Sequence, residues 1–350
     1  LKNKIRENRE ENYLNQNTYN GFINTDEGKI REYFNEFAER EFSVSQLEVF
    51  AKCPFKYFSE RVLKIKPIEE PTEEAEPLEL GSVLHSILYE FYSKVTEEEI
   101  PINMQGTEEF LNLKKILFEI AERKIASLNL NSPLAFFEKE KILGIEGDKE
   151  NSILYKFLVE ETENESKFKP KYFEYSFGNI PKRNTNFSNR TLEIGELKLR
   201  GTIDRIDIDE ENKFFNVVDY KLKGKKPTQN ELYEGLSLQL PVYLMAGKQI
   251  LEEETSEDYS NHEMIIYSLN FKEGKFGKDP VNVKGRGKST ANEKTELNNN
   301  LIDSIKEKLG EYHNKIKNGE YHLSTLENRE EKACNYCDFQ SFCRVKEVFE

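Results

Sequence analysis

Two carboxylates and a lysine stand at positions where they could bind a cation together. Residues 201–207 (GTIDRID) and 217–221 (VVDYK) are short runs rich in β-branched residues, separated by turn-forming residues 209–212, a pattern that predicts a β-hairpin. Side chains two apart on a strand share a face, so Asp219 and Lys221 should project together while Tyr220 points away. Pairing of the strands would bring Asp204 beside Asp219. Because Mg²⁺ prefers oxygen ligands, this pair of acids below a lysine is a candidate metal site.

The ordinary alternative is a solvated ion pair, since Asp-x-Lys on an exposed strand is worth only about 0–1 kcal/mol. The flanking residues argue against it. Ile203, Ile206, Val217 and Val218 are apolar, and a charge without a partner among such neighbours is costly. Because a metal-bound water is a nucleophile at neutral pH, the stretch favours hydrolytic chemistry.

The four cysteines of the chain form a second candidate site. Cys53 lies near the start, and Cys334, Cys337 and Cys343 follow one another with the spacing C-x2-C-x5-C. Thiolates clustered in this way favour zinc or an iron–sulfur cluster, and the spacing alone does not choose between them. Disulfides are the alternative, but they are disfavoured in the cytoplasmic compartment expected for this chain.

Other predicted elements must position these residues. An apolar stripe with helical spacing starts at Leu80, and His85 lies at its edge, four residues after Gly81; a lone histidine there is more often a packed core residue than a ligand. Residues 43–48 (SVSQLE) predict a helix that leads to Cys53, with Ser45 as N-cap and Glu48 at the capping-box position.

The remaining elements follow from periodicity. Residues 172–177 alternate as a strand that carries Glu174, and residues 231–252 read as a helix with Gln239 and Tyr243 on one face. Pro241 is unfavourable inside a helix and suggests a start near Leu238. Helical stripes fill residues 96–168, and residues 292–317 predict a final amphipathic helix.

Composition narrows the functional classes. A net charge of −14 argues against a general phosphate-binding surface, although a local basic groove can coexist with an acidic exterior. A third of the residues are charged, and no run of about 18 apolar residues or signal-peptide pattern occurs. We therefore expect a polar-surfaced cytoplasmic protein with no membrane segment.

The motifs GTIDRID, VVDYK and LQLPVYL (residues 238–244) resemble the AddB-type, RecB-like branch of the PD-(D/E)xK nucleases. The resemblance implies an α/β fold with a central mixed sheet flanked by helices, a helical insertion and an iron–sulfur staple that joins the two ends. Its expected boundaries are a connector from an upstream region at 1–41 and a nuclease domain at 42–346. Within that domain it implies the insertion at 96–168, the catalytic core at 169–283, and the last helix and cysteines at 292–346.

The resemblance also implies roles for individual residues. His85, in a Gly-x-x-x-His helix, would bind Mg²⁺ or Mn²⁺ together with Asp204, Asp219 and the Tyr220 carbonyl. Lys221 would orient or deprotonate the attacking water. Acidic and polar side chains that would assist the metal, the water or the substrate are Glu174, Gln239 and Tyr243.

The cysteine pattern matches the same family. Cys53 and the trio Cys334, Cys337 and Cys343 would bind a [4Fe-4S] cluster. Joining segments about 280 residues apart in this way would remove loop-closure entropy on the order of 5 kcal/mol from the unfolded chain.

The implied function is a metal-dependent DNA exonuclease in an AddAB/RecBCD-like complex that processes double-strand breaks. Its partners would be an AddA-type helicase subunit and a single DNA strand threaded from a duplex end. Two alternatives stay open: a non-catalytic DNA-binding scaffold module of such a complex, and a stand-alone iron–sulfur nuclease of the CRISPR-adaptation type. The three intact residues Asp204, Asp219 and Lys221 argue against the first, and the long insertion at 96–168 argues against the second.

Overall fold

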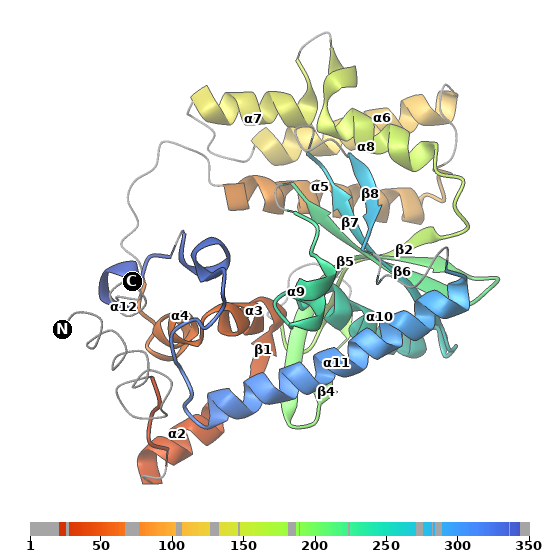
Figure 1. Ribbon diagram of the computed structural model, residues 1–350. Helices are drawn as coiled ribbons and strands as arrows, with labels where there is room; N and C mark the ends of the chain where they lie inside the picture. Colours follow the sequence, from red (N-terminus) through yellow and green to blue (C-terminus); the bar gives the residue numbers. More distant parts are fainter. Residues whose placement is uncertain are drawn as a thin grey trace.

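The computed structural model describes residues 21–343, apart from 26–27, 67–76, 103–106, 127–132, 146–147, 181–186, 189, 223–224, 271–275, 282, 284–288 and 336. A mixed β-sheet lies between two helical layers (Figure 1). No helix in this described part of the chain is long and apolar enough to cross a membrane.

The sheet has the strand order β3-β2-β5-β6-β7-β8, and β1 and β4 pair with the first half of β5. Its strands are β1 (Glu41–Ser43), β2 (Lys169–Phe177), β3 (Phe187–Ser188), β4 (Leu192–Ile194), β5 (Leu197–Asp209), β6 (Phe214–Lys221), β7 (Ser260–Ser268) and β8 (Gly277–Pro280). The predicted hairpin is confirmed, since β5 and β6 are antiparallel with Arg205 opposite Val218. Strand β7 runs parallel to β6, so the chain must cross over between them, and helices make this connection.

The first helical layer covers one face of the sheet and consists of α5 (Pro77–Glu97), α6 (Glu108–Ala126), α7 (Pro133–Leu143) and α8 (Ile153–Thr162) (Figure 1). These helices share a hydrophobic core with strand residues such as Phe173, Val218 and Tyr267. The helices predicted between residues 96 and 168 therefore exist, and they cover the sheet as expected.

The second layer packs on the other face and consists of α2 (Gly28–Ala38), α3 (Val44–Lys52), α9 (Gln229–Tyr233), α10 (Gln239–Thr255) and α11 (Ala291–Lys317). Short helices α4 (Pro54–Tyr57) and α12 (Gln340–Cys343) lie near the cysteines. Phe34 and Phe37 place α2 in this core. The boundary at residue 42, like the other predicted domain limits, stays a prediction.

Two local predictions about helix starts had different outcomes. The true N-cap of α3 is Ser43, and its capping box is completed by Gln46 rather than by Glu48, so the predicted Ser45 cap is wrong. Both serines allow a cap, and the pairing of β1 with β5 ends the extended segment at Ser43. The start of α10 near Leu238 is confirmed: residues 231–252 are divided into α9 and α10, and Leu238 is the N-cap of α10.

The alternation of side chains is interrupted in the two strands that carry acidic site residues. On β2, Phe173 packs in the core under α5 and Tyr175 packs in the opposite core, although they are two residues apart. Glu174 between them has a left-handed backbone with φ of 44°. On β5, Ile203 belongs to the core of the second helical layer, whereas Arg205 contacts α8 of the first layer. The strands thus change faces at Glu174 and Asp204, and both carboxylates lie where the two layers meet.

Candidate metal and nuclease site

Three potential metal ligands converge from α5, β2 and β5. One ligand atom each of His85, Glu174 and Asp204 lies within 4.8 Å of the other two. The imidazole Nδ1 is 3.1 Å from Glu174 Oε1 and 3.5 Å from Asp204 Oδ1. The sequence placed these three residues on separate elements, and the fold brings them together as the resemblance implies.

Both nitrogens of the His85 ring point at acceptors. Nδ1 faces the two carboxylates, and Nε2 donates to the Tyr220 carbonyl at 3.2 Å. Burial alone would lower the pKa of His85, but Asp204 and then Glu174 outweigh it and raise the pKa to about 11. The histidine therefore carries an extra proton in a place where a cation could replace that proton.

Asp219 lies beside this group on β6, and Lys221 and Gln239 hold its carboxylate. Lys221 Nζ is 2.8 Å from Asp219 Oδ2, which confirms that the two side chains share a strand face. Gln239 donates from Nε2 to Asp219 Oδ1 at 2.7 Å and to the Tyr243 hydroxyl at 3.0 Å, and it accepts from Lys221 Nζ at 3.1 Å. Gln239 and Tyr243 thus face the site from the first turn of α10, as their i, i+4 spacing indicates.

The two aspartates interact electrostatically. Burial and the nearby Asp204 carboxylate raise the pKa of Asp219 to about 7, against the opposing effect of Lys221. Burial disfavours the charged form of Lys221, but Asp219 outweighs burial and raises the lysine pKa above its ordinary value. Asp204 Oδ2 also accepts from the Tyr220 backbone N–H at 2.9 Å, which ties the two strands together at the site.

The charges of this group do not balance. Three carboxylates, Glu174, Asp204 and Asp219, face a lysine and a histidine, and Asp219 is only 1% exposed. Without a metal, protons on His85 and Asp219 offset the excess negative charge. A divalent cation would compensate the same excess, and carboxylate oxygens, an imidazole and a backbone carbonyl are suitable donors for it. The residues therefore fit a hard divalent ion.

The left-handed backbone of Glu174 costs free energy, on the order of 1–3 kcal/mol for a non-glycine residue. Such conformations persist where the surrounding structure holds them, and they concentrate at functional sites. Here the conformation turns the carboxylate of Glu174 toward His85, which a regularly alternating strand with Phe173 and Tyr175 on one face would not do.

The cysteines gather at a second place, far from the sheet. All four, from opposite ends of the chain, line one small pocket that also includes Phe55, Leu323 and Phe339. The backbone N–H of Phe55 donates to His322 O at 3.0 Å and joins the two ends of the chain beside this pocket. The cysteines that line it are Cys53, Cys334, Cys337 and Cys343.

The sulfur environment suits thiolate ligands. The Lys56 backbone N–H donates to Cys53 Sγ at 3.4 Å, since Cys53 is the N-cap of α4. Burial, opposed by such backbone bonds but reinforced by the other cysteines, raises the pKa of Cys53 to about 11. Because the thiolates repel one another, a bound metal centre would offset the cost of bringing them together. The four residues fit a common metal centre.

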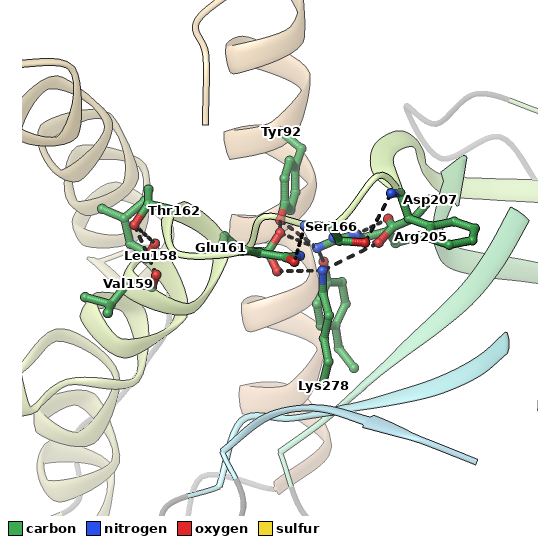
Figure 2. A network of polar contacts seen from close by, with 12 residues as sticks. Tyr92, Leu158, Val159, Glu161, Thr162, Ser166, Arg205, Asp207 and Lys278 are labelled. Carbon is green, nitrogen blue, oxygen red and sulfur yellow. Dashed lines mark hydrogen bonds and ion pairs between the residues drawn. The ribbon is translucent and has the colours of Figure 1, made fainter. Parts of the chain in front are cut away.

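A buried ionic network was missing from the sequence predictions (Figure 2). Arg205, fully buried, forms a two-point ion pair with Asp207 and contacts Glu161 Oε2 at 2.8 Å. Tyr92 donates to Glu161 at 2.6 Å, and Lys278 lies 3.3 Å from the other Glu161 oxygen. The signal was available: Arg205 and Asp207 are charged residues within the same apolar strand that made Asp204 conspicuous.

The mixed sheet, with an acid-x-lysine strand paired to a second acid, defines the PD-(D/E)XK class of nuclease folds. The sequence pattern of the PD-(D/E)XK nuclease superfamily matches residues 41–344, so the chain belongs to this superfamily.

Particular relatives are named as the B-type subunit of an ATP-dependent helicase/deoxyribonuclease. The protein of Clostridioides difficile (strain 630) is 33% identical over 260 residues, which cover 73% of this chain and 21% of that protein. The protein of Staphylococcus aureus (strain JH9) is 24% identical over 362 residues, covering 87% of this chain and 30% of that protein. The chain thus spans about a fifth to a third of the length of these relatives.

Proposed function

We propose that this domain is a DNA nuclease that hydrolyses phosphodiester bonds with a divalent cation, Mg²⁺ or Mn²⁺. The observation that carries the proposal is the uncompensated negative charge of three carboxylates around His85. The ligands would be His85, Asp204, Asp219 and the Tyr220 carbonyl. Glu174, which contacts His85, would assist the cation or the attacking water.

The protein groups have separate tasks in this reaction. When bound, the cation would polarise the phosphate and lower the pKa of a bound water. Lys221, held at 2.8 Å from Asp219, orients the water and stabilises negative charge that develops on the phosphate oxygens. Gln239 and Tyr243 fix Lys221 and Asp219 from α10 and position the DNA strand.

The test is cleavage of linear DNA in the presence of Mg²⁺ by the parent and by Asp219→Ala. We expect the rate to fall by at least about 100-fold while the sheet stays folded, because the variant loses a ligand and the partner of Lys221. Asp303→Ala, which removes an exposed carboxylate on α11, is the matched control and should cleave normally. Equal rates for the parent and Asp219→Ala would overturn the proposal.

We further propose that the cysteine pocket binds a [4Fe-4S] cluster. Within the described chain, no three of the four cysteine sulfurs lie within 4.8 Å of one another. A tetrahedral zinc site with Zn–S bonds of about 2.3 Å would hold its sulfurs roughly 3.8 Å apart, whereas a cubane places iron and sulfide between the thiolates and separates them further. Protein purified without oxygen should be brown with broad visible absorption. A colourless preparation with stoichiometric zinc would exclude the cluster.

The proposed setting is a helicase–nuclease complex that processes DNA ends. The support is similarity to relatives named as one subunit of an ATP-dependent helicase/deoxyribonuclease. An AddA-type helicase subunit would then be the partner and would deliver a single DNA strand to the site. Mapping cleavage products on a linear duplex, with and without such a subunit, tests this: the products should change when the helicase subunit and ATP are added. Identical products would contradict the partnership.

A further inference from the structure

Glu48 makes two contacts across 190 residues of sequence that the nuclease site itself does not explain. Its carboxylate oxygen Oε1 accepts hydrogen bonds from the backbone N–H groups of Leu238 at 2.7 Å and Gln239 at 3.1 Å. Because Gln46 completes the capping box of its own helix, α3, Glu48 is not used there. It caps another helix instead.

The capped helix has no cap of its own. Leu238, the N-cap residue of α10, offers no side-chain acceptor, and its own conformation is helical. The first N–H groups of a helix need partners from outside the helix, and a carboxylate suits the positive end of the helix dipole. Glu48 therefore supplies to α10 what serine, threonine or aspartate at the N-cap would normally supply.

The first residue of α10 is Gln239, the residue that connects Lys221 and Asp219. Its backbone N–H bonds to Glu48, while its side chain accepts from Lys221 and donates to Asp219. A shift of this helix end would therefore move both side-chain contacts together. The Glu48 carboxylate also adds to the negative field around Lys221.

Helix α3 is itself held at both ends. It begins directly after β1, which pairs with β5 at Phe42 and Leu199, and its C-cap residue is Cys53. Glu48 thus lies about midway between the strand that carries Asp204 and the cysteine pocket. Leu47 and Phe50, both essentially inaccessible to solvent, anchor the helix in the core on either side of Glu48.

We propose that Glu48 is a positioning residue of the nuclease site: it fixes the start of α10 and thereby the Gln239 side chain that holds Lys221 against Asp219. Its effect on catalysis rests on the proposed nuclease function. Its effect on α10 does not, because the two backbone contacts are independent of any metal or substrate.

The first experiment measures hydrogen exchange of the Leu238 and Gln239 amides in the metal-free protein. Glu48→Ala should accelerate this exchange by at least about 10-fold, because both N–H groups lose their acceptor. Glu48→Gln, whose amide oxygen can still accept, should restore most of the protection. Glu293→Ala, which removes the capping-box acid of α11, is the matched control and should leave exchange at 238 and 239 unchanged.

The second experiment is a double-mutant cycle on DNA cleavage. Glu48→Ala should lower kcat by about 10-fold with little change in KM. In a Gln239→Ala background the same change should cost less than about 2-fold, since the two residues act through one path. Additive losses, or unchanged amide exchange in Glu48→Ala, would overturn the positioning role. If the parent does not cleave DNA, the nuclease proposal fails while the exchange data still decide whether Glu48 holds α10.

Discussion

Two neighbouring residues of β5 serve two buried charge clusters with opposite properties. Arg205 belongs to the network under the helical layer, where Glu161 and Asp207 are matched by Arg205 and Lys278. Asp204 belongs to the candidate metal site, where acids outnumber the cationic side chains. Both clusters are buried and hydrogen-bonded, so burial does not distinguish them.

The charge balance does. In the network every charge has an opposite partner, and burial of Glu161 is outweighed by Arg205 and Lys278, which hold its pKa below the ordinary value. In the site the corresponding balance fails, and burial with Asp204 raises the pKa of Asp219 to about 7. A compensated cluster holds elements together, whereas an uncompensated one is prepared for a cation from solution.

The largest expected effect is on the network. Arg205→Met should destabilise the protein by about 3–5 kcal/mol, because it leaves two buried carboxylates without their main partner. Urea unfolding of the metal-free protein measures this. Lys306→Met, which breaks an exposed pair on α11, is the control and should change the midpoint little. A similarly small change for Arg205→Met would mean that the network does not stabilise the fold.

The site should respond in the opposite way. Asp204→Asn should reduce Mg²⁺-dependent cleavage at least about 100-fold, yet leave the metal-free protein as stable as the parent or more stable, because it relieves repulsion with Asp219. Thermal unfolding with and without Mg²⁺ provides the measurement. The added metal should raise the Tm of the parent and not that of the variant. A metal-induced rise of equal size in both would contradict the assignment.

Acid stability should depend on Glu161. Its pKa is depressed in the folded protein, so its contribution is complete above the ordinary value of 4.5 and is lost as the pH falls below that value. Glu161→Gln removes this contribution, and between pH 4.5 and 3 its stability should fall less steeply, by up to about 1.4 kcal/mol per pH unit. Chemical unfolding across this pH range measures the slopes, and parallel slopes would refute the expectation.

The smallest effect concerns Tyr267, beside the network. Its ring is fully buried, and its hydroxyl has no hydrogen-bond partner among the residues that the structure describes. Because an unpaired buried hydroxyl costs free energy, Tyr267→Phe should leave stability unchanged or raise it by about 1 kcal/mol. A clear loss of stability in urea unfolding would reveal a partner for this hydroxyl.

Local patterns were sufficient for part of the site. Alternation along 217–221 placed Asp219 with Lys221, helical spacing placed Gln239 with Tyr243, and the turn at 209–212 predicted the hairpin. They were insufficient for the start of α3, where two serines two residues apart both offered a cap. The predicted metal ligands and cluster ligands converge as groups, and their roles stay proposals.

The sequence by itself determined which side chains share a face, because strand and helix periods are set by the backbone over a few residues. Only the tertiary structure decided that Glu174 turns through a left-handed conformation to meet His85, and that Glu48 caps a helix 190 residues away. The same is true of the ion pair between Glu161 of α8 and Arg205. These contacts join elements far apart in the chain, and their geometry depends on how the whole core packs.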